Sequence, residues 1–265
     1  MELNKIYNGN ALNLLKSVSD NSIDMVMTSP PYDSMREYDG IVWNFEIFKL
    51  IAQDLKRVLK DGGVIVWVVG DQTINGSETG TSFRQALYFK ELGLNLHDTM
   101  IFRKHNFVPL THNRYEQEFE YMFVFSKGKP KTFNPIMIKS KWGGTETWGK
   151  SEIPYADNTF KTKEKTVVNE YKQHGNIFEY AVGKLANEGI EHPAMFPKQL
   201  VIDQINTWTN KGDLVLDPFM GSGTTACAAR EREREWIGFE ISEKYCEIAN
   251  ERLQNQVIQT SLFDD

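Results

Sequence analysis

The sequence predicts an α/β fold in which a mostly parallel sheet carries helices on both faces. Strand-like and helix-like segments alternate along most of the chain. Residues 64–69 are apolar at every position, as expected of a parallel strand that is buried on both faces. A second buried strand at residues 214–217 leads through a glycine-rich turn into a helix, which outlines a small-molecule site. These three observations define the fold class.

Length and composition are those of an ordinary globular protein. The 265 residues suffice for one large domain with a modest insertion, and 40% of them are hydrophobic and 25% charged. No apolar run approaches the ~20 residues of a membrane span, and the N-terminus lacks an apolar signal segment. Only two cysteines occur, Cys227 and Cys246, so neither a disulfide framework nor a metal site is expected, and a reducing cytoplasm fits.

The N-terminal part of the chain is predicted to supply about half of the sheet. Strands are expected at residues 3–7, 23–27, 64–69, 98–103 and 120–125, and helices at 11–15, 45–59 and 82–92. The helix at 45–59 is amphipathic, because its apolar residues recur at helical spacing. Asp61-Gly62-Gly63 is expected to end that helix, with a glycine in the left-handed conformation.

The strand at 23–27 ends abruptly in Thr28-Ser29-Pro30-Pro31-Tyr32, which we call the proline corner. Each proline fixes φ and lacks an N–H, and the residue before a proline is pushed away from helical conformations. The corner is therefore stiff and extended, and it can aim a carbonyl and a hydroxyl at a ligand beside the flat ring of Tyr32. Taken alone, such a motif is in most cases only a strand-terminating turn with a packed tyrosine.

Between Ser126 and about Glu191 the regular periodicity fades, and we predict a small separate lobe over residues 127–190. Residues 127–175 contain ten lysines, no arginine and five acids, a net charge of +5. The whole chain has a net charge of −6, so the remainder carries −11. A basic segment in an acidic body is the pattern expected of an insertion that meets a polyanion.

Regular patterns resume after residue 191. A helix is expected to begin at Pro197, followed by the strand at 214–217, a helix from Ala226, a strand at 236–240 and a last helix capped by Ser242. Between the strand and the second of these helices lies Asp217-Pro218-Phe219-Met220-Gly221-Ser222-Gly223-Thr224-Thr225, which we call the glycine turn.

The glycine turn indicates the chemistry of its ligand. Gly221 and Gly223 let the backbone approach a bound molecule, and the helix N-terminus beyond them presents free N–H groups to an anion. Asp217 can accept a hydrogen bond from an ammonium group, and Glu240, 23 residues later, can bind both hydroxyls of a ribose. An amine, a carboxylate and a ribose diol together describe S-adenosylmethionine. A generic nucleotide-binding fold is the alternative, although neither a dinucleotide fingerprint nor a P-loop is present.

Three motifs resemble those of the DNA methyltransferases that methylate amino groups. The proline corner is similar to their catalytic motif and the glycine turn to their cofactor motif, while His192-Pro193-Ala194-Met195-Phe196-Pro197 resembles the motif just before the cofactor strand. This order, with the variable lobe in the middle, is the permuted β class. The resemblance implies a Rossmann-like methyltransferase fold, with a mostly parallel sheet of seven strands and a reversed last hairpin. It also implies a catalytic half (1–126), a target recognition lobe (127–190) and a cofactor-binding half (191–265).

The resemblance also implies roles for individual residues. Ser29 Oγ and the Pro30 carbonyl would each accept an N–H of the target amine, and Tyr32 would stack on a base flipped out of the duplex. Phe196 and Phe219 would wall in the cofactor. The catalytic set is then Ser29, Pro30, Pro31 and Tyr32, and the cofactor-binding set is Asn8, Asn10, Thr28, Phe196, Asp217, Pro218, Phe219, Gly221, Ser222, Gly223, Thr224, Thr225 and Glu240. Asn10 stands where the family often has an aspartate, which makes it a departure from the pattern.

The sequence also bears on which atom of a DNA base would receive the methyl group. Methylation at carbon 5 of cytosine requires a cysteine nucleophile, and neither Cys227 nor Cys246 lies in a Pro-Cys turn, which excludes that chemistry. Serine before Pro-Pro-Tyr, and Tyr38-Asp39-Gly40 shortly after it, resemble the cytosine-N4 enzymes, whereas adenine-N6 enzymes more often carry aspartate. We favour cytosine N4 and keep adenine N6 as the alternative.

The lobe is expected to bind double-stranded DNA. Lys139, Lys141, Trp142 and Lys150 are the candidates to grip phosphates and stack on bases, and solvated surface lysines are the plain alternative. A methyltransferase acting on RNA or on a protein amide, and a non-catalytic DNA-binding protein, are the competing functions. A restriction endonuclease acting separately is a possible partner, and the protein is expected to be a monomer or dimer.

Overall fold

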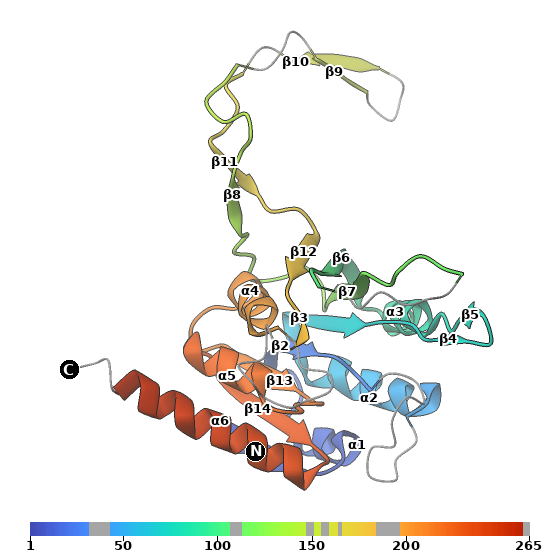
Figure 1. Ribbon diagram of the computed structural model, residues 1–265, viewed down its shortest axis with the longest axis vertical. Helices are drawn as coiled ribbons and strands as arrows, with labels where there is room; N and C mark the ends of the chain where they lie inside the picture. The colour runs from blue at the N-terminus through green and yellow to red at the C-terminus, as the bar shows by residue number, and fades with distance from the viewer. Residues whose placement is uncertain are drawn as a thin grey trace. The chain divides into compact units, whose positions relative to one another are not determined.

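The computed structural model describes residues 1–31, 43–106, 113–146, 151–154, 159–163, 166–183 and 197–261 (Figure 1). The chain divides into two compact units. The main unit comprises Met1–Asn134 and Asn176–Asp265, and the small unit comprises Pro135–Gly175. Tyr32, the motif at 192–196, Lys150 and Tyr38-Asp39-Gly40 lie outside the described residues.

The main unit is built on one large sheet, which confirms the predicted α/β class. Its strand order is β1-β14-β13-β2-β3-β7-β6-β12, and β7 is antiparallel to both of its neighbours while all other pairs are parallel. The strands are β1 (Lys5–Asn8), β2 (Ile23–Thr28), β3 (Leu59–Val69), β6 (Asn95–Lys104), β7 (Phe119–Ser126), β12 (Ile177–Tyr180), β13 (Leu214–Asp217) and β14 (Glu235–Glu240).

The sheet contains one strand more than the seven that were expected. The additional strand is β12, which pairs in parallel with the edge strand β6. Its four residues alternate in burial, with Phe178 buried, so that it extends the hydrophobic surface of the sheet. Sequence periodicity does not reveal such a short strand, and it falls in the span 127–190 that was predicted as lobe. The expected reversed hairpin is β6 and β7.

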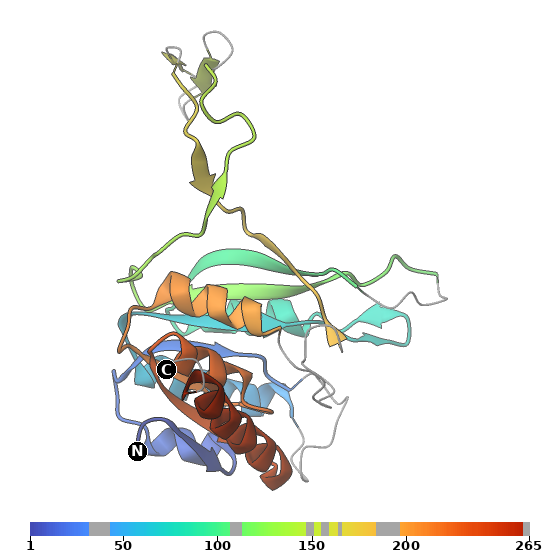
Figure 2. The same ribbon diagram turned by 60° about the vertical axis from the view of Figure 1, so that its left-hand side comes forward.

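Helices cover both faces of the sheet (Figure 2). One group consists of α1 (Ala11–Leu14), the 3-10 turn η1 (Leu15–Ser17), α2 (Phe45–Val58) and α3 (Thr81–Glu91), and the other of α4 (Lys198–Trp208), α5 (Thr224–Glu231) and α6 (Glu243–Ser261). A short hairpin, β4 (Thr73–Ile74) and β5 (Ser77–Glu78), precedes α3. Among the helices of the described residues, none combines the length and the apolar character needed to span a membrane.

The core beneath α2 and α3 is rich in aromatic rings. Trp67 of β3 is fully buried, and its ring lies edge-on to Phe89 with the centroids 5.3 Å apart. Its indole N–H donates to Gln85 Oε1 at 2.8 Å, which satisfies the one polar atom of the side chain. The predicted amphipathic helix is confirmed, because α2 buries Phe48, Ile51, Ala52, Leu55 and Val58.

The predicted role of Asp61-Gly62-Gly63 as a helix stop is wrong. Helix α2 ends at Val58, and β3 already begins at Leu59, so the three residues lie inside the strand. Gly62 is left-handed (φ +78°), but its N–H donates to the Lys127 carbonyl at 2.7 Å rather than closing the helix. The chain bulges here, since Ile23 pairs with Leu59 while Met25 pairs with Val64.

Asp24, near the start of β2, joins three neighbouring segments at the amino-terminal edge of the sheet. Its buried carboxylate forms ion pairs with Lys60 (2.7 Å) and Lys131, and it accepts the Leu214 N–H at 2.9 Å. Burial acts to raise the pKa of Asp24, but the Leu214 N–H and the two lysines outweigh it and lower the pKa below its ordinary value. The ionised carboxylate therefore favours the folded state.

Asp24→Asn is expected to reduce the free energy of unfolding at pH 7 by about 1–3 kcal/mol, because both lysines lose a buried anionic partner. Since the folded-state pKa lies below the unfolded one, this contribution is present above the ordinary pKa of 3.8 and is lost as the pH falls through the lowered value. Urea denaturation at pH 7 and pH 3 measures it, with Asp61→Asn as the control for an exposed ion pair, since Asp61 lies 3.6 Å from Lys127. Equal losses in the two variants at pH 7 would contradict the role of Asp24.

The small unit contains two antiparallel ribbons. One pairs β8 (Met137–Lys139) with β11 (Tyr171–Gln173), and the other pairs β9 (Ser151–Pro154) with β10 (Phe160–Lys163). Three of the ten lysines counted between residues 127 and 175 belong to the main unit, where Lys127 and Lys131 bind carboxylates. Residues 135–175 hold seven lysines and five acids, a net charge of +2. The small unit itself is thus only mildly basic.

Candidate active site

The two main motifs follow adjacent strands at the point where the strand order of the sheet reverses. Strands β13 and β2 are neighbours, and the chain runs from β13 through α5 to β14 on one side and from β2 through α2 to β3 on the other. Ligands of open α/β sheets bind at such a reversal, outside the carboxyl ends of the strands. The glycine turn begins at the end of β13 and the proline corner at the end of β2. The fold therefore brings the two motifs together.

Asp217 connects the two motifs through direct hydrogen bonds. Thr28 Oγ1 donates to Asp217 Oδ1 at 2.6 Å, and Thr225 Oγ1 donates to Oδ2 at 2.6 Å. The Phe219 N–H adds a bond of 3.0 Å to Oδ1. Thr28 and Asp217 are both buried, so these bonds are shielded from water. The side chain of Thr28 is thereby directed at Asp217.

Burial raises the pKa of Asp217 to about 6. The two threonine hydroxyls and the Phe219 N–H act in the opposite direction, and the nearby charge of Glu240 adds to the rise. An acid that is destabilised in its charged form is a strong acceptor for a cation. A carboxylate of this kind is suited to an ammonium group, and the role of Asp217 as its acceptor stays a prediction.

The glycine turn is shaped by contact with α6 as well as by its own backbone. Helix α5 begins at Thr224, two residues earlier than predicted, and Gly223 is its N-cap with φ +84°. A Cβ atom at Gly223 would lie 2.7 Å from Ala249 Cβ in α6. The sequence assigned Gly223 to the approach of a ligand, whereas the observed close approach is to a helix.

Gly223→Ala is expected to lower the free energy of unfolding by about 2–4 kcal/mol, from left-handed strain and overpacking against Ala249. Gly80→Ala is the matched control, since Gly80 is also a left-handed helix N-cap (φ +64°) but has nothing within 4 Å of its Cβ position. Thermal unfolding of both variants separates strain from crowding, and Gly223→Ala combined with Ala249→Gly should recover the crowding part. Equal losses at Gly80 and Gly223 would refute the contact argument.

Glu240 and the residues at the end of β1 close one side of the site. Glu240 Oε2 accepts the Gly221 N–H at 2.8 Å, and Oε1 accepts the Ser242 N–H at 2.9 Å. A carboxylate is an acceptor of several hydrogen bonds, which is the chemistry that a ligand hydroxyl requires. Asn8 Nδ2 donates to the Ile241 carbonyl at 2.9 Å, and Asn10 Oδ1 caps α1 by accepting the Leu12 N–H. The two asparagines thus help to build this edge of the site.

Two residues at the site were missed by sequence reasoning. Arg252 of α6 donates from Nη1 to the Ser222 carbonyl at 2.6 Å and lies 3.2 Å from Thr224 Oγ1. Its guanidinium clamps the glycine turn from the side of the last helix. An arginine on an amphipathic helix gives no signal of such a role in the sequence.

Trp43 is the second residue that was missed. Its ring is buried and packs edge-on against Phe219 of the glycine turn, with the centroids 5.3 Å apart. Its indole Nε1 is buried and has no hydrogen-bond partner among the residues that the structure describes. Such donors are rare in folded proteins and call for an explanation, and a bound molecule that carries an acceptor would supply one.

The remaining predicted residues are placed as follows. Ser29 and Pro31 are partly buried and Pro30 is buried at the end of β2, and Pro218 and Ser222 are buried in the glycine turn. Cys227 and Cys246 are buried in α5 and α6, as expected of packed helix residues. In the small unit Lys139, Lys141 and Trp142 are exposed, and Lys141 Nζ lies 5.2 Å from the Trp142 ring centroid. Tyr32, Phe196 and Lys150 are outside the described residues.

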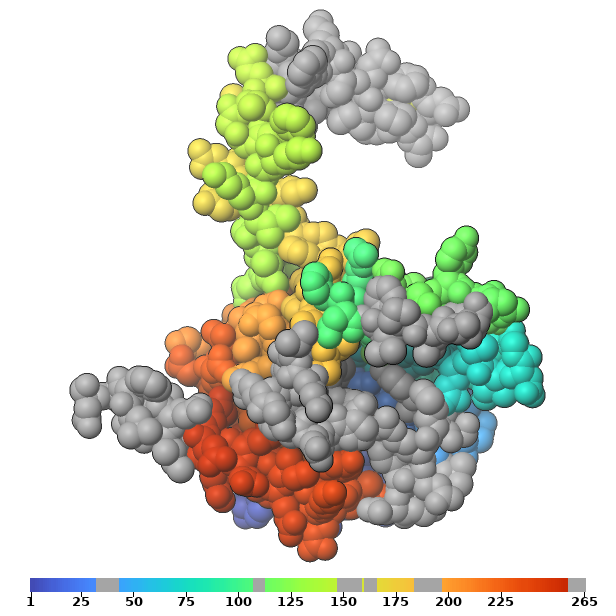
Figure 3. Space-filling model, in the orientation of Figure 1, coloured from blue at the N-terminus to red at the C-terminus, as the bar shows by residue number. Residues whose placement is uncertain are grey.

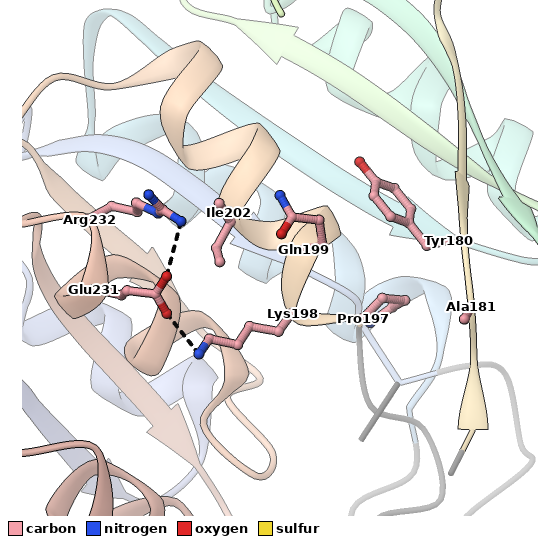
Figure 4. A pocket seen from close by; sticks show the side chains of 8 residues that line it. All are labelled: Tyr180, Ala181, Pro197, Lys198, Gln199, Ile202, Glu231 and Arg232. Atoms are coloured by element: carbon pink, nitrogen blue, oxygen red, sulfur yellow. Dashed lines mark hydrogen bonds and ion pairs between the residues drawn. The ribbon is translucent and has the colours of Figure 1, made fainter. Parts of the chain in front are cut away.

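A separate cleft of about 370 Å³ lies beside the start of α4 (Figure 4). Its lining includes an ion-pair chain in which Glu231 binds Lys198 at 2.7 Å and Arg232 at 3.0 Å. None of the predicted site residues lines this cleft. Both of its cations are paired with Glu231, and we assign the cleft no part in the chemistry.

Comparison with known proteins shows the family of the chain. A family model described as DNA methylase, for N6 and N4 methyltransferases, matches residues 23–251. The orphan methyltransferase M.BamHII of Bacillus amyloliquefaciens is 50% identical over 249 residues, which cover 92% of this chain and 93% of the relative. The DNA adenine methyltransferase YhdJ of Escherichia coli is 29% identical over 265 residues, which cover 95% and 83%. Among solved structures, the M1.HpyAVI–SAM complex is 25% identical with a TM-score of 0.64, covering 94% of this chain and 98% of that one.

Proposed function

The chain belongs to the DNA methyltransferases that methylate exocyclic amino groups, and on that premise we propose that it methylates the N4 amine of a cytosine flipped out of duplex DNA. The observation that carries the proposal is the hydrogen bond between Thr28 and Asp217. It fixes the end of the catalytic strand against the start of the cofactor turn. The residues that hold the amine and those that hold the methyl donor are thereby kept in register.

The residues around the glycine turn fit S-adenosylmethionine. When bound, this cofactor supplies an electrophilic methyl group. Asp217 would accept its ammonium group, and Glu240 would accept its ribose hydroxyls. The unpartnered Trp43 indole N–H and the first N–H groups of α5 are donors for its carboxylate. The ammonium group and the ribose hydroxyls of the cofactor would thus meet carboxylates that accept hydrogen bonds, and its carboxylate would meet N–H groups that donate them.

Ser29 and Pro30 would activate the target amine. The lone pair of an exocyclic amine is delocalised into the ring, which makes the nitrogen a weak nucleophile. Ser29 Oγ and the Pro30 carbonyl would each accept one N–H and so draw the nitrogen toward tetrahedral geometry. Because Thr28 is anchored to Asp217, the two acceptors that follow it are held in place before the base arrives.

Tyr32 would hold the ring of the flipped base by stacking. A base inside a duplex cannot present its amine to the methyl donor, so the enzyme must extrude it and replace the lost stacking. The amine proton leaves after transfer, and no cysteine nucleophile takes part. Pro31 keeps the corner extended, so that the tyrosine follows the two acceptors closely.

The choice of cytosine rests on Ser29. In the β class, serine before Pro-Pro-Tyr is typical of cytosine-N4 enzymes, although a hydroxyl and a carboxylate each accept one hydrogen bond from an amine. Adenine N6 is the second candidate, and the similarity to YhdJ, which is named a DNA adenine methyltransferase, favours it. The two readings differ only in which base enters the site.

We assign target recognition to the middle segment, with Lys139, Lys141, Trp142 and Lys150 as its first DNA contacts. The exposed Trp142 ring offers a stacking surface, and Lys141 and Lys150 offer charge to phosphates. Duplex DNA is the partner that this function requires. A restriction endonuclease that recognises the same sequence would act as a separate protein.

Mass spectrometry of nucleosides tests the proposal. DNA is incubated with the purified protein and S-adenosylmethionine that carries a deuterated methyl group, and is then digested to nucleosides. We expect deuterated N4-methylcytosine. Deuterated N6-methyladenine in its place would establish the second candidate, and label found only in RNA or protein would overturn the assignment to DNA.

A further inference from the structure

We propose that the ribbon of β8 and β11 reads base edges in the major groove of the target DNA, with Gln173 and Lys139 as specificity-determining residues. This inference rests on the proposed function, because it concerns how a DNA methyltransferase selects its sequence. It uses only contacts inside the small unit. The two strands lie side by side in Figure 1 and are exposed in Figure 3, where β8 is lime and β11 is yellow.

The pairing register defines the two faces of the ribbon. Tyr171 lies opposite Lys139, Lys172 opposite Ile138, and Gln173 opposite Met137. Directly opposed side chains share a face and successive ones alternate. One face therefore carries Met137, Lys139, Tyr171 and Gln173, which we call the reading face. The other face carries Ile138 and Lys172.

All four residues of the reading face are exposed. Met137 is 51% and Tyr171 55% exposed, so both side chains are accessible to a bound molecule. No hydrogen bond or ion pair of the Lys139 or Gln173 side chain occurs among the described residues, whereas their backbones pair within the ribbon. The face offers a cation and an amide without a single acid, which suits a polyanion and not an acidic protein surface.

The ribbon is held in shape by backbone contacts that continue beyond it. The Ser140 N–H donates to the Glu170 carbonyl at 2.7 Å, and the Gly144 N–H donates to the Val168 carbonyl at 2.9 Å. A Cβ atom at Gly143 would lie 2.7 Å from Glu170 Cα, so the two segments of the chain approach too closely here to leave room for a side chain. A short ribbon without a core of its own is only marginally stable, and these bonds give it a defined register.

The side chains of the reading face match the chemistry of base edges. The major groove, about 12 Å wide, admits a two-stranded ribbon. The Gln173 amide can bind adenine N6 and N7 as a pair, and Lys139 can bind guanine O6 and N7. Met137 offers an apolar contact to a thymine methyl group. On the opposite face Lys172 is left to contact phosphate, which carries no sequence information.

Selective substitution on the two faces tests the inference. The full-length variants Gln173→Ala, Lys139→Ala and Lys172→Ala are each incubated with S-adenosylmethionine and a duplex library covering all substitutions of the wild-type site, and methylated bases are located by sequencing. We expect Gln173→Ala and Lys139→Ala each to lose about 5- to 150-fold discrimination at one base pair and to keep the other positions. Lys172→Ala should reduce methylation evenly across the library and lower the salt dependence of binding.

The outcomes separate this inference from the proposed function. If the wild type methylates one sequence and Gln173→Ala and Lys139→Ala methylate it with unchanged discrimination, the reading role is refuted while the proposed function stands. An even loss across the library in those two variants also refutes it, since it indicates phosphate contact. Methylation of no DNA by the wild type overturns both. Thermal unfolding of each variant verifies that an altered preference comes from a folded protein.

Discussion

Asp217→Asn is expected to weaken the binding of S-adenosylmethionine by about 10- to 100-fold at pH 7.5, while the protein stays folded. The variant keeps the shape of the side chain but removes the charge that we propose holds the ammonium group, and a hydrogen bond to a charged group contributes about 1.5–3 kcal/mol. It also leaves one of two buried hydroxyls, Thr28 or Thr225, without its acceptor. Where that hydroxyl is the one of Thr28, the hydrogen bond between the two motifs is lost.

The pH dependence of the wild type distinguishes this account from a general loss of structure. Because the pKa of Asp217 is raised to about 6, the side chain is protonated below that pH and cannot hold a cation. Cofactor affinity should therefore rise as the pH increases from 5 to 7.5 in the wild type and stay flat in Asp217→Asn. Titration calorimetry at several pH values measures both.

The same raised pKa has a consequence for stability without cofactor. The folded protein binds this proton more tightly than the unfolded chain, so Asp217 favours the folded state at low pH. That contribution, about 3 kcal/mol, is lost as the pH rises from the ordinary value of 3.8 to about 6.

Asp213→Asn is the control for the measurement of cofactor affinity in Asp217→Asn, since Asp213 precedes the same strand at its opposite end. An equal loss of affinity in that variant would contradict a specific role of Asp217.

Tyr32→Ala is expected to reduce methyl transfer by about 100-fold and to leave the dissociation constant of S-adenosylmethionine within about threefold of the wild type. Stacking of a base on an aromatic ring contributes about 1–3 kcal/mol, and the flipped base has no other proposed platform. Tyr32→Phe keeps the ring and should retain most of the activity. Single-turnover transfer to a duplex substrate measures the rate, and calorimetry measures the cofactor.

The result that would contradict the stacking role is equally specific. Full activity in Tyr32→Ala would show that the ring is dispensable. This result is expected if the proline corner is only a turn that ends the strand. A loss in Tyr32→Phe as large as in Tyr32→Ala would assign the effect to the hydroxyl. Parallel loss of cofactor binding would mean that Tyr32 belongs to the cofactor site.

Much of the fold was predictable because its elements have strong periodicity. The apolar runs of β2, β3 and β13 and the stripe of α2 each satisfy their pattern over several residues, and the structure confirms them. The errors lie where local preference competes with tertiary pairing. Gly62 suits a helix end, but β3 starts at Leu59 because that residue pairs with Ile23. Strand β12 is too short to show a period at all.

The sequence motifs of the candidate site could be predicted, but the tertiary contacts that hold these motifs in place could not. Asp217 is the last residue of β13 and Glu240 is the last residue of β14. Because these strands are parallel neighbours in the sheet, their carboxyl ends lie at the same edge and bring the two side chains close. The Arg252 clamp and the contact of Gly223 with Ala249 depend on how α6 docks. Such contacts join residues that are well separated in the chain and leave no local pattern. The unpartnered indole of Trp43 is likewise visible only once the core is assembled.

Sequencing that reports modified bases across the genome of a host expressing this gene tests the central claim most directly. The account predicts N4-methylcytosine at one fixed position of a single short sequence, and its absence from cells that express Tyr32→Ala. N6-methyladenine at a fixed site would contradict the assignment of the base. A genome without any new methylated amine would contradict the assignment of a DNA methyltransferase activity to this chain.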